Sequence, residues 1–301
     1  MVTGEESRIA PGLYLVATPI GNLNDITLRA LDVLRSVDRI ACEDTRQTQK
    51  LLNHYQIHVP TISCHEHNED ARARELVQAL KDGARIALVS DAGTPAISDP
   101  GSRLVEAAIA AGVAVIPIPG ANAALSALVA SGLPAAEFTF LGFLPEKSGA
   151  RRTRLEELAA GAQSPASAAP RTLIFYEAPH RIQETLADLE SVWGPELKIV
   201  LARELTKVHE EFLRGTVAAV RRDLDVRDRV RGEFTLLIEP PLKPSPAGSL
   251  GATEKLSIRL ERLQSETGID EKEALKRLAR ELGQSKSELY RELQRERARK
   301  K

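Results

Sequence analysis

One stretch of this chain constrains its fold more than any other, because a strand-like run, a long loop of small residues and an amphipathic run follow one another directly. The apolar and β-branched run 85–89 precedes the loop 90–101, whose sequence is SDAGTPAISDPG. Apolar side chains then return at helical spacing between 104 and 109. Ligands of open α/β sheets bind at the carboxyl ends of strands, where small residues let them approach the backbone. We therefore expect a strand, a binding loop and a helix here.

The ends of this helix are marked by residue type. Asp99 and Pro100 stand where an N-cap and a first helical residue belong, and Gly112 stands where a helix ends. The loop matches neither G-x-G-x-x-G nor G-x-x-x-x-G-K-[ST], so it does not predict a dinucleotide or triphosphate site. A second loop of similar composition, 17–25, follows the strand-like run 13–16. Two such loops favour a ligand site over an ordinary turn.

The first half of the chain alternates short β-rich runs with helical ones, which predicts a parallel sheet covered on both faces. The expected strands are Leu13–Ala17, Arg39–Cys42, Thr61–Ser63, Arg85–Ser90 and Val113–Ile118. The expected helices are Asp25–Arg35, Thr45–Asn53, Asn68–Lys81, Ser102–Ala111 and Ala121–Ala130. We assign 1–136 to this N-terminal α/β domain.

The second α/β domain, 137–240, is expected to contain a mixed sheet, because two of its strands follow one another without room for a helix. The expected strands are Phe138–Phe143, Thr172–Tyr176, Lys198–Leu201, Glu211–Arg214 and Phe234–Ile238. The expected helices are Arg151–Leu158 and Ile182–Trp193, with a loose loop at 161–170 between the first helix and the next strand.

A proline-rich linker, 241–251, separates these domains from a charged helical tail, 252–301. The tail has the length and the central glycine of a helix-turn-helix, from Asp270 to Gln294 around Gly283. Its end carries five cations between 295 and 301. Such a tail is either a solvated helical pair or an appendage that contacts RNA phosphates.

Composition limits the possible partners. With 41 basic and 42 acidic residues the formal net charge is −1, so any nucleic-acid binding must use local patches. Aromatic residues make up 4% of the chain, which argues against base-stacking platforms. The two cysteines lack C-x-x-C spacing and the N-terminus lacks an apolar signal segment. We expect a cytoplasmic protein without a membrane span.

Two groups of polar residues invite a chemical interpretation. Glu43 and Asp44 end a predicted strand beside Arg46 and could supply a general base, although one of the two could equally cap the next helix. Histidines and a cysteine also gather between 54 and 67, but their spacing fits no zinc finger. We expect no metal there; substrate or dimer contacts, or a solvated loop, are the remaining interpretations.

Six ordered segments together resemble one known family. They are 17–25 (ATPIGNLND), 41–46 (ACEDTR), 65–69 (HEHNE), 89–101 (VSDAGTPAISDPG), 175–181 (FYEAPHR) and 202–207 (ARELTK). The chain resembles the ribosomal RNA small subunit methyltransferase I family, of the tetrapyrrole methylase superfamily, over about 12–240. This resemblance implies a two-domain tetrapyrrole-methylase-like fold and S-adenosylmethionine-dependent 2′-O-methylation of a cytidine ribose in 16S ribosomal RNA. A related precorrin-type tetrapyrrole methyltransferase is the alternative, and a noncatalytic RNA-binding module is a third hypothesis.

The resemblance also implies roles for residues in the matching segments. The catalytic candidates are Glu43, Asp44, Glu177 and Lys207. The candidates for cofactor binding are Pro19, Gly21, Asp91, Gly93, Thr94, Ile97, Ser98 and Tyr176. The candidates for substrate binding are Arg46, His65, His67, His180, Arg181 and Arg203. The implied partners are ribosomal RNA or the assembled small subunit, and a second copy in a homodimer.

Overall fold

A computed structural model describes residues 9–65, 68–162 and 171–241, and in the tail 256, 260, 263–265, 268–281, 289–291 and 293–294. The chain divides into two compact units, Met1–Pro241 and Leu242–Lys301. We describe each unit by itself.

The first sheet is entirely parallel, as the alternating pattern predicts. Its order is β3-β2-β4-β1-β5. The strands are β1 (Gly12–Val16), β2 (Arg39–Cys42), β3 (Thr61–Ser63), β4 (Arg85–Val89) and β5 (Val115–Ile118). The helices of this half are the short 3₁₀ helix η1 (Leu23–Asp25), α1 (Leu28–Ser36), α2 (Thr45–His54), α3 (Glu69–Lys81), α4 (Ser102–Ala110) and α5 (Ala123–Ser131).

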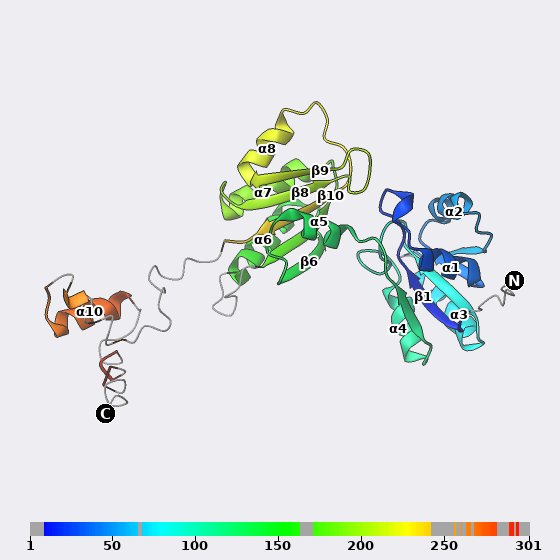
Figure 1. Cartoon of the computed structure of the whole chain (residues 1–301), viewed down its shortest axis with the longest axis horizontal. Coiled ribbons are helices and arrows are strands. Elements are labelled where there is room, and N and C mark those ends of the chain that lie inside the picture. The colour runs from blue at the N-terminus through cyan, green and yellow to red at the C-terminus, as the bar shows by residue number, and fades with distance from the viewer. Residues whose placement is uncertain are drawn as a thin grey trace, which may run out of the picture. The chain divides into compact units, whose positions relative to one another are not determined.

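Alternating side chains of β1 serve the two faces of this sheet. Tyr14 and Val16 pack with α1 and α2, whereas Leu13 and Leu15 pack with α3 and α4. Because successive side chains of a strand point to opposite faces, one apolar strand supplies both cores. The arrangement holds the carboxyl ends of β1 and β4 side by side (Figure 1).

The second sheet is mixed, as expected, with the order β6-β7-β10-β8-β9. Its strands are β6 (Phe138–Phe143), β7 (Thr172–Glu177), β8 (Lys198–Arg203), β9 (Glu211–Thr216) and β10 (Phe234–Glu239). Only β6 and β7 pair in parallel. One face packs against α6 (Ser148–Ala162), α7 (Ile182–Trp193) and α8 (Val217–Asp225), of which α8 was not predicted from the sequence.

The other face of the second sheet is covered by α5, which comes from the first half of the chain. Ala124, Ala127 and Leu128 of this helix pack against Val200 and Leu237 of the second sheet (Figure 1). The helix therefore ties the second sheet to the strand that precedes it.

A predicted helix start and a predicted N-cap were wrong. The helix expected at Asp25–Arg35 begins only at Leu28, because Thr27 is its N-cap and accepts a hydrogen bond from the Ala30 amide. The helix expected at Ser102–Ala111 does begin at Ser102, but its N-cap is Gly101 at φ +127°, without a side-chain cap, and not Asp99. Asp99 therefore does not cap this helix, contrary to the expectation from the sequence.

The second unit contains α10 (Glu271–Glu281), whose first turn is capped by Asp270 through the Glu273 amide at 2.8 Å. Ala274 and Leu278 pack with Leu289 and Leu293, as the apolar pattern of a helical pair requires. Residues 242–255, Gly283 and the basic end 295–301 lie outside the described residues. Within the part of the chain that is described, no helix is long and apolar enough to cross a membrane.

Candidate functional site

The two loops singled out from the sequence meet in the structure. Thr18 and Gly93 form a two-way backbone bridge, with N···O distances of 2.9 and 3.0 Å. The Thr18 hydroxyl also donates to the Ser90 carbonyl at 3.0 Å, and the Ser90 hydroxyl donates to the Gly93 carbonyl at 3.1 Å. The loops after β1 and β4 thus form one hydrogen-bonded platform at the carboxyl edge of the sheet.

The loop after β4, residues 90–101, has an unusual backbone. Gly93 and Gly101 have φ values of +88° and +127°, and Ala96 and Ser98, which are not glycines, have φ values of +65° and +60°. A left-handed conformation costs an L-residue about 1–2 kcal/mol, so the surrounding contacts must hold the loop in this shape. Strain of this kind is concentrated at ligand sites.

A cavity of about 330 Å³ opens against this platform. Its walls come from the 90–101 loop, from the start of α5, from the end of β7 and from the start of β10. The lining residues are Ile20, Asp91, Ala92, Gly93, Thr94, Ile97, Ser98, Asp99, Asn122, Ala123, Phe143, Tyr176, Glu177, Ala178, Pro179, Leu205, Glu233, Phe234 and Thr235. The volume is that of a small-molecule site, and residues of both halves of the first unit enclose it.

Six of the eight cofactor candidates line this cavity: Asp91, Gly93, Thr94, Ile97, Ser98 and Tyr176. Pro19 and Gly21 are not among the lining residues, whereas Ile20 between them is. A Cβ on Gly21 would lie 2.4 Å from Cγ of Lys207, so Gly21 gives space to a side chain of the second half rather than to a ligand.

Carboxylates give the cavity a negative charge. Burial is the main cause that raises the pKa of Asp99 to about 6, and the nearby charges of Glu43 and Asp91 add to this effect. Asp91 is held in turn by the Asp44 amide, which donates to its Oδ1 at 3.2 Å. A group of acidic side chains in a partly buried cavity favours a cationic ligand, because the ligand's charge would offset their mutual repulsion.

Tyr176 forms the aromatic part of the wall. Its ring lies edge-on to Phe140 and Phe143, with centroids 4.9 and 5.7 Å apart. Burial is the main cause that raises the pKa of its hydroxyl. Phe143 and Tyr176 line the cavity, so the aromatic wall offers apolar ring surface to a ligand.

Asp44 caps a helix. Its Oδ1 accepts a hydrogen bond from the Arg46 amide at 2.8 Å, which makes it the N-cap of α2, and its carboxylate also binds the Arg46 guanidinium. These hydrogen bonds lower the pKa of Asp44 to about 2. Of the alternatives left open for Glu43 and Asp44, the structure thus shows the cap at Asp44.

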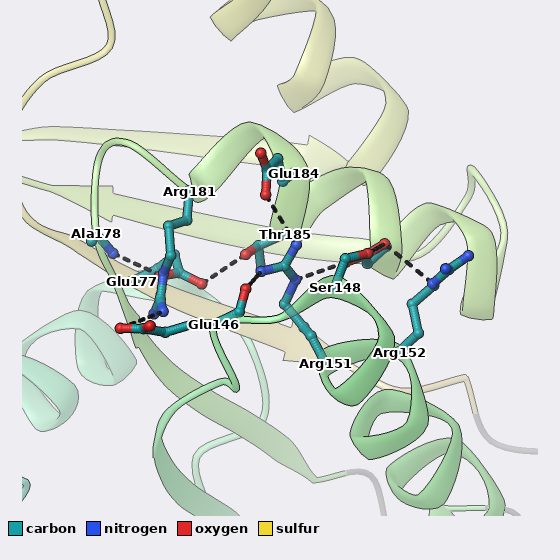
Figure 2. Close-up of polar contacts among 10 residues, drawn as sticks. Glu146, Ser148, Arg151, Arg152, Glu177, Ala178, Arg181, Glu184 and Thr185 are labelled. Atoms are coloured by element: carbon teal, nitrogen blue, oxygen red, sulfur yellow. Dashed lines mark hydrogen bonds and ion pairs between the residues drawn. The ribbon is translucent and has the colours of Figure 1, made fainter.

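Glu177 has a fully engaged carboxylate (Figure 2). One oxygen accepts from the Ala178 amide and from Arg181, each at 2.8 Å, and the other accepts from the Thr185 hydroxyl at 2.7 Å. Its side chain is only 1% exposed. Because Ala178 and Pro179 line the cavity, this buried carboxylate fixes the turn that forms one wall.

A second buried arginine supports the same region from α6. Arg151 has no exposed side-chain surface, and it binds Asp188 at 2.7 Å and the Glu146 carbonyl at 3.0 Å (Figure 2). Ser148 donates to both carboxylate oxygens of Asp188 at 3.2 Å. A buried charge stays in a protein only when it is paired in this way.

Two further basic candidates of the second half, Lys207 and Arg203, lie in the turn after β8 and at the end of that strand. Lys207 donates to Glu204 at 2.8 Å and to Glu233, a cavity residue, at 3.0 Å. Burial by itself would lower the pKa of Lys207, but these two hydrogen bonds outweigh it and raise the pKa. Arg203 of the same region binds the Arg231 carbonyl and Glu211.

Of the histidine candidates, His65 and His180 are not among the residues that line the cavity. The His65 amide donates to Asn68 at 2.9 Å, His180 is exposed, and His67 lies outside the described residues. Over the described ranges, no group of three or more His, Cys, Asp or Glu side chains could hold a metal ion.

Sequence reasoning missed several cavity residues. Asn122 and Ala123 follow β5, and a strand end in a parallel sheet was a signal that could have found them. Glu233–Thr235 carry no local signal, because only sheet pairing brings β10 between β7 and β8. Leu205 lies within the recognised segment 202–207 but was not named as a binding residue. Asp99 was inside the recognised loop but was interpreted as a cap.

Comparisons with known proteins agree with this geometry. The family model described as Tetrapyrrole (Corrin/Porphyrin) Methylases matches residues 12–221, which places the chain in that class. Solved structures share the fold: the methyltransferase CobJ has a TM-score of 0.55 at 19% identity, covering 76% of this chain and 94% of that one. A diphthine synthase has a TM-score of 0.55 at 14% identity, covering 75% and 89%.

Relatives of higher identity define the family more narrowly. A ribosomal RNA small subunit methyltransferase I of Halalkalibacterium halodurans is 47% identical over 284 residues, which cover 92% of this chain and 93% of the relative. One from Vibrio cholerae is 53% identical over 230 residues, covering 76% and 77%. The chain belongs to the ribosomal RNA small subunit methyltransferase I family.

Proposed function

We propose that this protein transfers the methyl group of S-adenosylmethionine to the ribose 2′-hydroxyl of a cytidine in small-subunit ribosomal RNA. The observation that carries the proposal is the acidic cavity where the two strand-end loops meet, in a chain whose relatives are named as small-subunit ribosomal RNA methyltransferases. The donor carries two positive charges, a sulfonium and an ammonium, and so complements Asp91 and Asp99.

The donor is held by main chain and side chains together. The backbone of 91–98 approaches it closely, because Gly93 in the cavity wall has no side chain. The rings of Tyr176 and Phe143 pack against its adenine, and Asp91 and Asp99 face its charged or hydroxyl groups. Positioning of donor and acceptor then supplies most of the rate enhancement, up to about 7–11 kcal/mol for well-oriented reactants.

The reaction is an in-line displacement. The ribose oxygen bonds to the methyl carbon, the carbon–sulfur bond breaks, and its electron pair stays on sulfur to leave neutral S-adenosylhomocysteine. The hydroxyl proton passes to a base, for which we propose Glu43, because its charge acts on Asp99 at the cavity. Asp44 and Glu177 position α2 and the 177–181 turn, and Lys207 fixes Glu233.

Substrate contacts are proposed for Arg46, His65, His67, His180 and Arg203. Arg181, which the resemblance also implied as a substrate contact, is 11% exposed and bound to Glu177, so we assign it to positioning the cavity wall. We also propose that the protein works in the cytoplasm and as a homodimer.

The test uses the full chain, methyl-labelled donor and unmethylated small subunits or their RNA, with a precorrin-type tetrapyrrole as the competing acceptor. We expect label in 2′-O-methylcytidine after nuclease digestion and mass spectrometry. Label in the tetrapyrrole alone would establish the alternative function, and label in a cytosine base would refute the 2′-hydroxyl as acceptor.

A matched pair of glycine variants tests the cavity. Gly93→Val places a side chain at a positive φ in the cavity wall, 3.3 Å from Ile20 Cγ2. Gly112→Val introduces similar backbone strain at φ +73°, where a Cβ meets nothing within 4 Å. Donor binding measured by calorimetry should weaken for Gly93→Val and persist for Gly112→Val.

A further inference from the structure

A second hollow lies on the N-terminal half, along α2 and the edge strand β3, and its chemistry is opposite to that of the cavity. This groove has a volume of about 410 Å³ and is lined by Thr45, Arg46, Gln49, Lys50, Asn53 and Thr61. Two of the six residues are cationic, four are polar and none is acidic. The sequence of α2, TRQTQKLLNH, likewise contains no acidic residue.

One face of α2 forms most of the groove. Gln49, Lys50 and Asn53 lie three, four and seven residues after Arg46, so the four residues line one side of α2. Leu51 and Leu52 of the same helix are buried in the protein, which leaves the polar side to solvent. Arg46 and Lys50 stand about 6 Å apart along the helix axis, close enough to meet neighbouring phosphates of one strand.

Hydrogen-bonding capacity remains on this face. Asp44 occupies Nε and Nη2 of Arg46, yet the arginine side chain is 87% exposed. The Lys50 ammonium gives one of its three hydrogens to Gln47 at 2.8 Å. Gln49 donates to Asn53 at 2.8 Å, which leaves the Gln49 carbonyl and the Asn53 amide hydrogens for a partner.

The residues at the start of α2 connect the groove to the cavity wall. The Asp44 amide donates to Asp91, a cavity residue, at 3.2 Å, and α2 begins with the very next residue. An acidic cavity for a cation and a basic, amide-bearing groove for a polyanion therefore adjoin. This separation of charge suits a protein that brings a cationic donor to a nucleic acid.

We propose that the α2 groove receives the single-stranded RNA next to the target nucleotide, with Arg46 and Lys50 on its phosphates and Gln49 and Asn53 on sugar hydroxyls or base edges. The proposal rests on the proposed function and names the surface that holds its substrate. Cations and side-chain amides are the groups that proteins direct at the nucleic-acid backbone and bases.

The experiment compares the wild-type chain with the double variant Arg46→Gln/Lys50→Gln. Binding of unmethylated small-subunit ribosomal RNA is measured at several salt concentrations, and donor binding is measured separately by calorimetry. Each phosphate contact to a single strand contributes about 0.7 to the slope of log K against log salt. We expect the slope to become shallower by about 1.4 and affinity at 0.1 M salt to fall about 25-fold, with donor affinity unchanged.

A second double variant, Arg35→Gln/Lys81→Gln, is the control. It removes one arginine and one lysine, both exposed, from the last turns of α1 and α3, and so changes the net charge equally. The control should keep the wild-type slope. Because Arg46 also binds Asp44, Lys50→Gln alone is made as well, with an expected slope change of about 0.7 and an unchanged melting temperature.

Two outcomes would overturn the proposal: an unchanged slope in the Arg46/Lys50 variant, or an equal loss in the control. Both leave the proposed function intact if the wild type still methylates the RNA. Absence of RNA binding and methylation by the wild type would instead refute the proposed function.

Discussion

The acidity of the cavity makes donor binding depend on pH in a calculable way. Asp99 has a pKa of about 6, and only its ionised form attracts the cationic donor. S-adenosylmethionine keeps its sulfonium and ammonium charges between pH 5 and 7, so the titration in this window belongs to the protein.

The sign and the size of this pH dependence follow from the linkage between donor binding and ionisation of Asp99. Bound donor holds Asp99 ionised, so the apparent Kd scales as 1 + 10^(pKa − pH) with the pKa of the free protein. This factor is about 1.1 at pH 7 and about 11 at pH 5, so affinity should fall about tenfold, or about 1.4 kcal/mol, over two pH units. At pH 6 donor binding should release about half a proton.

Calorimetry in buffers of different ionisation enthalpy measures both quantities. Asp99→Asn should flatten the pH profile and weaken binding at pH 7 by roughly 10- to 100-fold, since hydrogen bonds to charged groups contribute about 1.5–3 kcal/mol. Asp32→Asn, on the exposed face of α1, should keep the wild-type profile. A Kd of the wild type that stays constant from pH 5 to pH 7 would refute the reasoning.

Three further predictions concern residues and segments outside the cavity lining. Asp188→Ala leaves the fully buried Arg151 without its main partner, so urea unfolding should show a loss of about 3–5 kcal/mol, whereas Glu184→Ala, at an exposed partner, should cost under about 1 kcal/mol. Lys207→Ala frees Glu204 and Glu233 and should lower the methylation rate more than the melting temperature; an unchanged rate would show that Lys207 is ordinary surface. Truncation after Pro241 removes the second unit and should leave donor affinity intact while making the salt dependence of RNA binding shallower; an identical slope would discard the RNA-contact role of the tail.

Much of the fold was determined by local sequence. The run 85–89, the small-residue loop after it and the amphipathic run from 104 predict strand, loop and helix independently of the rest of the chain. Periodicity and turn chemistry act within about ten residues, so they can be recognised without tertiary structure. The parallel first sheet followed from the alternation of strand-like and helical runs, and the mixed second sheet followed from two strands without room for a helix between them.

The tertiary structure decided which of those elements contact one another and which of their residues reach the cavity. Asp99 looked like a helix cap, and only the packing of its loop turns it to the cavity beside Glu43 and Asp91. Helix α5 is apolar on all sides, so its own sequence could not say that it covers the second sheet. Pairing of β10 between β7 and β8 brings 233–235 to a cavity whose platform lies more than a hundred residues earlier. Contacts at such separation depend on which surfaces bury each other, and that choice belongs to the whole chain rather than to any one segment.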